Sequence, residues 1–522
     1  MTIAEMLARN ARMYGSETAL IELKPSQALR REITWREFDD RANRIANALI
    51  ARGVKKGDKV IHLMMNSINW LEAYFGIIRT GAWAVPLNFR FSSHDIQYCA
   101  DIAEARLMIL SEEFTERVTA ARPRLDTIRD YLFTGEDPPP GMESLEKVMH
   151  SSTPQPAPVA INNEDECGLY FTSGTTGAPK PILLTHKNME CAAITENYHH
   201  YQKHEDNFIL LSPLYHTGSK MHWFGSMIVG GRATILTEIC PQNIFQAVHQ
   251  ESGTIVFLLV PWAQDILGAI ERRELKIDDY DLSSWRLMHI GAQPVPPSLV
   301  KHWKEYFPDM QYDTTYGLSE STGPGCVHLG IENEHKVGAI GKPGFNWETR
   351  IVKDSGEDIA PGETGELVVR GNGVMKEYYK NPEKTAESIK DGWLHTGDIA
   401  RTDSDGFIYL VDRKKDVIIT GGENIFPVEV ETVLQGHPKV YDAGVIGIPD
   451  ERLGEIVAVV IDPKPGVTLT EEEVMQFCEQ NLPRYKRPRR IIFDKVPRNP
   501  TGKIEKPRMR QQYTGIQESF KT

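Results

Sequence analysis

The sequence predicts an α/β protein with a large N-terminal part, in which parallel-rich sheets are layered with helices, and a smaller α+β unit at the end. Three observations lead to this prediction. The chain has 522 residues, enough for roughly two to four domains of ordinary size. Strand-like and helix-like apolar patterns alternate along the first several hundred residues. After residue 412 the pattern changes to short strands and helices, so we expect one domain at 1–412 and another at 413–522.

The first elements alternate between helix and strand. Thr34 and Glu37 form a capping-box pattern, and apolar residues recur behind them at helical spacing until Gly53. Three segments follow, which we expect to be strand, helix and strand in turn: 60–64, 70–78 and 84–87. This order is typical of a parallel sheet with helical crossovers.

Further along, residues 151–158 contain three prolines and no periodicity, which predicts an exposed connection. Residues 255–260 are apolar up to Pro261 and predict a buried strand. The last part predicts the following elements: a helix from Pro427, strands at 443–448 and 456–461, and a helix from Thr470.

Composition excludes several classes of protein. Acidic residues outnumber basic ones and give a formal charge of −13, so the chain as a whole repels nucleic acid. The six cysteines form no C-x-x-C pair, which argues against a disulfide framework or a cysteine zinc site. Glu5, Arg9 and Arg12 interrupt the start, and no apolar run is long enough to span a membrane. We therefore expect a soluble cytoplasmic protein without integral membrane association, and a homodimer remains open.

A loop rich in glycine and hydroxyl groups follows the strand-like residues 168–171. Glycines let backbone N–H groups close around phosphate oxygens, hydroxyls add donors, and Lys180 adds a positive charge. The spacing of Gly174 and Gly177 is not that of a Walker A loop, and a flexible turn is the alternative. The candidate phosphate-binding residues are Thr172, Ser173, Gly174, Thr175, Thr176, Gly177 and Lys180.

With this loop, four further motifs occur in a fixed order: Tyr316-Gly-Leu-Ser-Glu320, Gly397-Asp398, Asp412-Arg-Lys-Lys-Asp416 followed by Gly421-Gly-Glu-Asn424, and Pro500-Thr-Gly-Lys503. The set resembles the adenylate-forming superfamily of acyl-CoA synthetases, luciferases and peptide-synthetase adenylation domains. The likeness covers about residues 34–503. It implies the adenylate-forming fold, in which the large domain includes a smaller β subdomain and the C-terminal domain is a mobile lid.

The resemblance implies a two-step reaction with ATP, Mg²⁺ and coenzyme A. A substrate carboxylate would attack the α-phosphorus of ATP to give an acyl-adenylate and pyrophosphate, and the thiol of coenzyme A would then take the acyl group. Glu320 and Thr172 would bind Mg²⁺, which prefers oxygen ligands. The implied nucleotide contacts, with Tyr316 facing adenine and Asp398 holding the ribose hydroxyls, are Gly291, Ala292, Gln293, Thr315, Tyr316, Gly317, Ser319, Asp398 and Arg413.

The lid would supply the groups that change between the two steps. Lys503 is similar to the family lysine that bridges the carboxylate and the α-phosphate, and Lys415 matches the hinge position. After rotation, Gly421, Gly422 and Glu423 would approach the entering thiol. The basic residues within 484–490 could attract the phosphates of coenzyme A, although an ordinary solvated face is an equally good explanation.

The acid itself is not identified by the sequence. Relatives line the acyl pocket after a Pro-x-x-His stretch, here 213–216, and His216 is also a catalytic candidate. The candidate acyl-site residues are Tyr215, His216, Trp223 and His289. Their aromatic character favours an apolar ring or a short chain, and Lys220 could pair with a second acidic group. As a whole, the sequence resembles CoA ligases of the medium-chain, aromatic or crotonobetaine/carnitine type.

Two other functions remain as alternatives: an acyl-AMP ligase that loads a carrier protein, and a catalytically idle nucleotide-binding relative. A serine hydrolase and a zinc protease are disfavoured, because neither G-x-S-x-G nor H-E-x-x-H occurs. His199, His200 and His204 lie close together without ligand spacing, and we expect them at the surface. Pro181 and Gln293 depart from the family pattern, at the exit of the phosphate loop and at the border of the acyl pocket.

Overall fold

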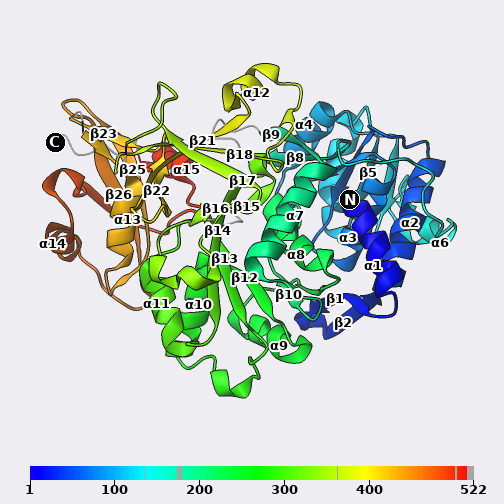
Figure 1. Ribbon diagram of the computed structural model, residues 1–522, viewed down its shortest axis with the longest axis horizontal. Coiled ribbons are helices and arrows are strands. Elements are labelled where there is room, and N and C mark those ends of the chain that lie inside the picture. Colours follow the sequence, from blue (N-terminus) through cyan, green and yellow to red (C-terminus); the bar gives the residue numbers. More distant parts are fainter. Residues whose placement is uncertain (136, 173–178, 361, 422, 500–501, 514–522) are drawn as a thin grey trace.

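The computed structural model describes residues 1–135, 137–172, 179–360, 362–421, 423–499 and 502–513. Figure 1 shows the N-terminal half on one side of the molecule, the strands that carry the central sheet in the middle, and the C-terminal unit on the other side. This is the adenylate-forming arrangement that the sequence predicts, a large α/β part with a smaller β subdomain and an α+β unit.

A nine-stranded sheet forms the middle of the molecule. In spatial order its strands are β16 (Lys342–Pro343), β15 (Gly323–His328), β14 (Gln311–Leu318), β13 (Leu287–Gly291), β12 (Ile255–Leu259), β10 (Asn207–Leu210), β11 (Arg232–Leu236), β1 (Thr18–Lys24) and β2 (Leu29–Thr34). From β14 to β1 the pairs are parallel. Parallel strands end at one edge of a sheet, so β13 and β14 bring their carboxyl ends together.

A second, eight-stranded sheet belongs mostly to the N-terminal half. Its strands are β19 (Glu377–Tyr378), β9 (Lys180–Thr185), β8 (Glu166–Thr172), β4 (Trp83–Pro86), β3 (Lys59–Leu63), β5 (Leu107–Leu110), β6 (Asp130–Phe133) and β7 (Glu143–Ser144). The predicted strands at 60–64 and 84–87 are confirmed as β3 and β4, which pair in parallel.

Helices connect these strands and fill the space between the sheets. They are α1 (Ile3–Met13), α2 (Trp35–Ala51), α3 (Ile68–Arg79), α4 (Ser93–Ala103), α5 (Thr115–Ala121), α6 (Leu145–His150), α7 (His186–His200), α8 (Thr217–Ile228), α9 (Pro241–Glu251), α10 (Val260–Glu271) and α11 (Pro297–Tyr306). The predicted capping box begins α2, since Thr34 Oγ1 accepts from Glu37 N and Glu37 accepts from Thr34 N. Helices α7 and α8 lie between the two large sheets, where their apolar side chains join one core with α2 and α3.

A third, antiparallel sheet is the smaller β subdomain. It contains β17 (Trp347–Val352), β18 (Gly365–Gly371), β21 (Trp393–Thr402), β20 (Ile389–Lys390) and β22 (Ile408–Arg413), with α12 (Pro382–Ser388) beside it. In this sheet Asp398 of β21 lies directly opposite Arg413 of β22.

The C-terminal unit has a sheet and cores of its own. Its elements are β23 (Ile418–Thr420), β24 (Glu423–Ile425), α13 (Pro427–Gln435), β25 (Val440–Asp450), β26 (Gly454–Pro463), α14 (Glu471–Asn481), β27 (Arg490–Phe493) and α15 (Lys506–Tyr513). The predicted helix from Pro427, the two strands and the helix capped by Thr470 are confirmed. A domain boundary at 412/413 stays a prediction.

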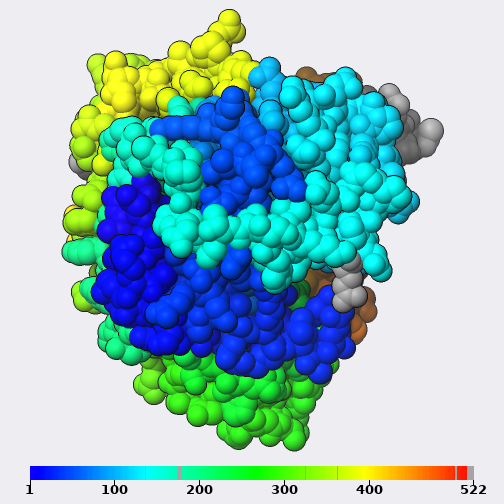
Figure 2. Space-filling view, turned by 90° about the vertical axis from the view of Figure 1, so that its right-hand side faces the viewer, coloured from blue at the N-terminus to red at the C-terminus, as the bar shows by residue number. Residues whose placement is uncertain are grey.

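Two further expectations, for residues 151–158 and for residues 255–260, are confirmed. Residues 151–158 carry no regular structure and are largely exposed, and β12 is buried throughout. All six cysteines are free. None of the helices in the described ranges combines the length and low charge that a bilayer span requires. Figure 2 shows the face formed by the N-terminal half, opposite the C-terminal unit.

Candidate active site

The nucleotide end of the site is organised around Asp398. Its Oδ2 accepts a hydrogen bond from the Tyr316 hydroxyl, and its Oδ1 lies 2.6 Å from Arg413 Nε. Burial and the neighbouring Asp398 carboxylate raise the pKa of Tyr316 well above its usual value, so the phenol remains a donor. Each carboxylate oxygen keeps a further lone pair, which fits the predicted ribose contact.

The predicted adenine border lies at the carboxyl ends of β13 and β14. Gly291 ends β13, and a Cβ built there would be 3.5 Å from the carbonyl oxygen of Thr315 in β14. Ala292 has φ of +66°, a left-handed conformation that side chains rarely adopt. Such strain persists where the surrounding structure fixes the backbone, and it often marks a binding site. Gly317 and Ser319 continue this edge into the turn that carries Glu320.

The phosphate loop is described only at its two ends. Thr172 ends β8 and Lys180 begins β9, and the two residues are direct partners in the antiparallel pair. The structure therefore brings the ends of the loop together. Five predicted phosphate contacts lie outside the described residues: Ser173, Gly174, Thr175, Thr176 and Gly177.

Glu320 is held in place by two hydrogen bonds from neighbouring residues. Its Oε1 accepts a 2.7 Å hydrogen bond from the Tyr378 hydroxyl, and its backbone oxygen accepts from Met375 N at 2.8 Å. The carboxylate of Glu320 still has free lone pairs, and the hydroxyl of Thr172 is also an oxygen ligand. Both groups are of the type that Mg²⁺ prefers.

Lys503 is presented by a tight turn of the C-terminal unit. Its backbone N–H donates to Asn499 Oδ1 at 3.0 Å, and Asn499 N donates back to the oxygen of Lys503 at 2.9 Å. A Cβ built on Gly502 would lie 3.5 Å from Pro261 and 3.6 Å from Gln293 Oε1. Gly502 therefore lies against the large domain, within van der Waals reach of Pro261 and Gln293.

The charges around Lys503 come from the nucleotide end. Burial and Arg413 lower the pKa of Lys503, while Asp398 and Glu320 act in the opposite direction. Lys503 is nevertheless an exposed residue, so solvent reaches part of its side chain. On the other side, burial followed by two lysine charges, one of them Lys503, lowers the pKa of His216 to about 3. The ammonium thus lies between the nucleotide end and His216.

The predicted hinge joins the two units through charged neighbours. Lys414 Nζ lies 2.6 Å from Asp354 of the large part, and Asp416 lies 2.9 Å from Arg510 of α15. Between them, burial lowers the pKa of Lys415.

The predicted thiol-facing segment follows the hinge in the chain. Gly421 N donates to the oxygen of Leu453 at 2.8 Å, and Glu423 is exposed in β24. Gly422 lies outside the described residues. Their approach to a thiol stays a prediction.

Tyr215 and His216 form an aromatic wall just before α8. The rings of Tyr215 and Phe89 meet edge to face at 5.3 Å, and those of Tyr215 and His216 lie 4.2 Å apart. The Tyr215 hydroxyl and His216 Nε2 are buried without a hydrogen-bond partner among the described residues. Unpaired buried polar atoms are costly, so these two are available to a ligand.

Lys220 does not take the position that the sequence suggested. It is fully buried, its Nζ donates to the backbone oxygen of His216 at 3.1 Å, and it lies 4.3 Å from the ring centroid of Tyr170. Burial lowers the pKa of Lys220 well below its ordinary value, and its amino group supports the backbone of the aromatic wall from behind.

Two predicted acyl-site residues lie apart from this wall. Trp223 is fully buried in α8, and its indole N–H donates to the oxygen of Gly231 at 3.3 Å, so it is a core residue with its polar atom satisfied. His289 lies in β13, where its ring packs 4.3 Å from that of His200 and its Nε2 bonds to Thr315 Oγ1 at 3.2 Å.

The expectation that His199, His200 and His204 are surface residues is wrong for His200. It is fully buried, and two buried carboxylates compensate for its loss of water. Its Nε2 bonds to Asp313 at 2.8 Å, and its Nδ1 lies 3.1 Å from Glu196. The signal was present in the sequence, since Glu196 and His200 are four residues apart and lie on one face of a helix.

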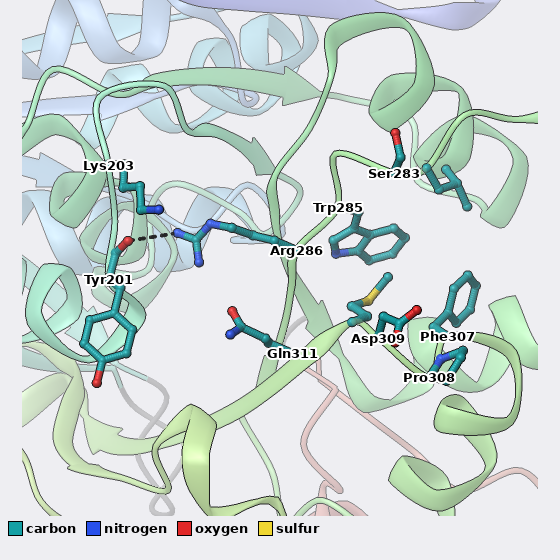
Figure 3. Close-up of a pocket in the computed structure, with 11 residues that line it drawn as sticks. Tyr201, Lys203, Ser283, Trp285, Arg286, Phe307, Pro308, Asp309 and Gln311 are labelled. Carbon is teal, nitrogen blue, oxygen red and sulfur yellow. Dashed lines mark hydrogen bonds between the residues drawn. The ribbon is translucent and has the colours of Figure 1, made fainter.

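A surface hollow of about 720 Å³ lies elsewhere. Figure 3 shows Trp285, Phe307 and Pro308 on one side of it and Arg286 on the other, where Arg286 donates to the backbone oxygen of Tyr201 at 3.3 Å. Arg286 precedes β13 and Gln311 begins β14, so the hollow lies at the amino ends of these strands. Ligands in open α/β sheets bind at the carboxyl ends, where the candidate site lies.

The sequence missed the contacts that close the C-terminal unit on the large one. Arg498 donates to Gln293 across this boundary and also pairs with Asp442 at 2.7 Å. Tyr441 donates its hydroxyl to Asp265 of α10 at 2.9 Å. Gln293 thus contacts the C-terminal unit. The sequence showed only that Gln293 departs from the family pattern, and did not predict this contact.

Comparisons with known proteins identify the family of the chain. The family model described as AMP-binding enzyme matches residues 7–379, and the model described as AMP-binding enzyme C-terminal domain matches residues 429–503. Feruloyl-CoA synthase of Amycolatopsis sp is 35% identical over 486 residues, 92% of this chain and 94% of that protein. The long-chain fatty acid CoA ligase FadD13 of Mycobacterium tuberculosis is 30% identical over 516 residues, 98% of each chain. A crystal structure of the anthranilate CoA ligase AuaEII in complex with anthranoyl-AMP is 26% identical, with a TM-score of 0.90, and covers 99% of this chain and 98% of that one.

Proposed function

Since the chain belongs to the AMP-binding enzyme family and is an acyl-CoA ligase that works through an acyl-adenylate, we propose that its acid substrate carries an aromatic ring. The observation that carries the proposal is the aromatic wall of Phe89, Tyr215 and His216 beside Lys503. Aromatic side chains stack favourably with an aromatic ligand in edge-to-face or offset geometry. The names of feruloyl-CoA synthase and the anthranilate ligase support the same class.

In the first step, Lys503 would lie between the carboxylate of the acid and the α-phosphate of ATP. Both groups are anions, so a preorganised cation lowers the barrier to their approach. His216 stays neutral, because its pKa of about 3 lies far below physiological pH, and it leaves the positive charge to Lys503. Tyr215 and His216 would offer their unpaired polar atoms to the acid.

At the nucleotide end, Asp398 would bind the ribose hydroxyls and Tyr316 would face adenine. Glu320 and Thr172 would hold Mg²⁺, which screens the phosphate charges when it is bound. In the second step the C-terminal unit would turn about Lys415 and bring Gly421 to Glu423 toward the thiol of coenzyme A.

The proposal is tested with purified protein and a panel of acids at fixed ATP, Mg²⁺ and coenzyme A. AMP release is measured for benzoate, anthranilate, ferulate and indoleacetate, and for hexanoate, decanoate, palmitate and carnitine. We expect kcat/KM to be at least about 10-fold higher for the best aromatic acid, a difference of about 1.4 kcal/mol. A preference for an aliphatic acid would contradict the substrate class and leave the reaction type intact. Turnover of free coenzyme A with any of these acids would exclude the alternative of a ligase that loads a carrier protein.

A further inference from the structure

A group of carboxylates and imidazoles is buried between α7, α8 and the central sheet, away from the residues that the proposed reaction uses. The members are at most 2% exposed and come from five elements: Glu196 and His200 from α7, His222 from α8, His289 from β13, Asp313 from β14 and His328 from β15. Charged and titratable side chains are rarely this deep unless they are paired or bind a metal.

Two of the histidines are oriented as metal ligands are. His200 Nε2 bonds to Asp313 Oδ2 at 2.8 Å, and His289 Nε2 bonds to Thr315 Oγ1 at 3.2 Å. His289 Nδ1 makes no hydrogen bond with any described residue, and His200 Nδ1 faces the carboxylate of Glu196. Histidines that bind a metal usually donate the other ring N–H to a carboxylate or another oxygen, which fixes the ring and exposes the lone pair.

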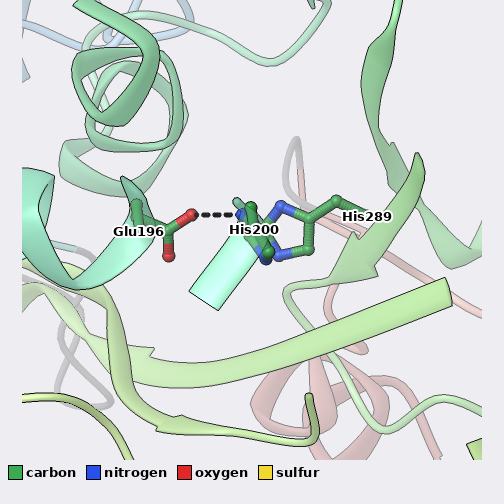
Figure 4. A group of neighbouring side chains, drawn as sticks. All are labelled: Glu196, His200 and His289. Atoms are coloured by element: carbon green, nitrogen blue, oxygen red, sulfur yellow. Dashed lines mark ion pairs between the residues drawn. The ribbon is translucent and has the colours of Figure 1, made fainter. Parts of the chain in front are cut away.

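Glu196 completes a three-residue group with these two rings. One ligand atom of each residue lies within 4.8 Å of the other two, and Figure 4 shows His200 between the carboxylate and His289. His200 Nδ1 is 3.1 Å from Glu196 Oε2, while Glu196 Oε1 has no hydrogen-bond partner in the described part of the chain. Bonds of about 2.0 Å to a tetrahedral ion place ligand atoms about 3.3 Å apart, so side-chain shifts of about 1 Å would complete the geometry.

The charge of the cluster favours a divalent ion. Glu196 and Asp313 carry two negative charges, and no lysine or arginine among the described residues forms an ion pair with either. One divalent cation with neutral imidazoles cancels both, which removes the large cost of an uncompensated buried charge.

We propose that Glu196, His200 and His289 bind one Zn²⁺ ion, with Asp313 and Thr315 holding the two rings from behind. Imidazole and carboxylate ligands suit zinc, and three protein ligands leave one position of a tetrahedral ion open. The ion joins α7 to β13, the strand that ends at Gly291. The inference is independent of the acid that the enzyme activates.

The test measures metal content of the full-length protein. The chain is purified, incubated with Zn²⁺, freed of loose metal by gel filtration and analysed by elemental mass spectrometry. We expect about one Zn²⁺ per chain, and less than about 0.1 in His289→Gln and in Glu196→Gln, because loss of a ligand weakens binding by at least as much as the 10–100-fold loss seen for outer-shell partners. His204→Gln is the matched control, since this partly exposed histidine also pairs with a glutamate, Glu17, at 2.8 Å. It should keep the full metal content.

Should either variant fail to fold, X-ray absorption at the zinc edge of the unaltered protein decides the matter. Two imidazoles and a carboxylate oxygen in the first shell would support the proposal, whereas sulfur ligands or water oxygens alone would overturn it. If the unaltered protein retains no Zn²⁺, and also no Co²⁺ or Ni²⁺ under the same treatment, the proposal fails. Pyrophosphate exchange is measured on the same samples, so failure here is distinguishable from failure of the proposed reaction.

Discussion

The two ends of the candidate site are built in opposite ways. At the nucleotide end, Tyr316 and Arg413 both bind Asp398, so each polar group has a partner before any ligand arrives. At the acyl end, the Tyr215 hydroxyl and His216 Nε2 are buried and have no partner in the described ranges. A preformed network of charged groups suits a ligand that does not vary, such as the nucleotide. Unpaired polar atoms in an aromatic wall can instead bind different acids, so the shape of the pocket determines which acid binds.

The difference also concerns charge. The nucleotide end depends on Asp398, Arg413 and Lys503, whose charges act on one another. The acyl end and the core behind it depend on histidines that burial keeps neutral, such as His216 and His62. We therefore expect the nucleotide end to be most sensitive to removal of a charged side chain. We expect the acyl end and the core behind it to be most sensitive to protonation of a histidine.

The largest expected effect is the loss of the Lys503 ammonium. Lys503→Ala removes the cation that we propose to act in the transition state of adenylation, and the loss of such a contact costs about 3–4 kcal/mol, or roughly 10²–10³ in rate. Pyrophosphate exchange into ATP measures this step. Conversion of supplied acyl-adenylate to thioester should continue at its normal rate.

Lys495→Ala is the matched control, because Lys495 is an exposed lysine of the same unit. Its variant should keep both half-reactions. Equal loss of both half-reactions in Lys503→Ala would contradict the assigned role and with it the contrast between the two ends.

The cluster of Tyr316, Asp398 and Arg413 could be proposed as a nucleotide site from the sequence, because its residues come in short motifs. Asp398 follows Gly397, and Arg413 lies within the charged run near the hinge, so each motif carries its own signal. The fold was equally accessible, since the alternation of strands and helices and the capping box at Thr34 are local patterns.

The acyl end and the buried cluster could not be assembled in this way. Glu196, His289 and Asp313 come from different elements, and only the sheet order brings them together. A single histidine in an apolar segment has no local pattern that distinguishes a core residue from a surface one. For that reason His200 was expected at the surface, and Trp223 in the acyl site.

An intermediate effect is expected from His62, which lies in the core behind the acyl end. Its ring packs 4.5 Å from that of Trp70, and neither nitrogen has a hydrogen-bond partner among the described residues. Burial, with a smaller effect of Lys220, lowers the pKa of His62 from 6.5 to about 3. Between pH 6.5 and pH 3, His62 is protonated in the unfolded chain but not in the folded chain. Its contribution to the free energy of unfolding is therefore fully present above pH 6.5 and is lost as the pH falls toward 3.

Between pH 7 and pH 5 this single group costs about 2 kcal/mol of unfolding free energy. Denaturant unfolding at the two pH values measures it, and His62→Leu should lose about 2 kcal/mol less than the unaltered chain. His94→Leu serves as the control, because His94 is exposed to water. An identical pH response in His62→Leu and the unaltered chain would show that His62 does not titrate on unfolding.

The smallest expected effect concerns the boundary between the lid and the large unit. Gln293→Ala removes the acceptor that Arg498 reaches across this boundary, while the Arg498 pair with Asp442 remains. A hydrogen bond to a charged donor that keeps a second partner contributes about 1 kcal/mol, so adenylation should slow about 3- to 10-fold. Thioester formation from supplied acyl-adenylate should be unchanged, because the contact belongs to the pose in which Lys503 reaches the nucleotide end. Gln311→Ala is the control, because Gln311 lies at the opposite edge of the same sheet, and it should alter neither step. Equal slowing of both steps in Gln293→Ala would mean that Gln293 shapes the site itself and does not act through closure of the C-terminal unit.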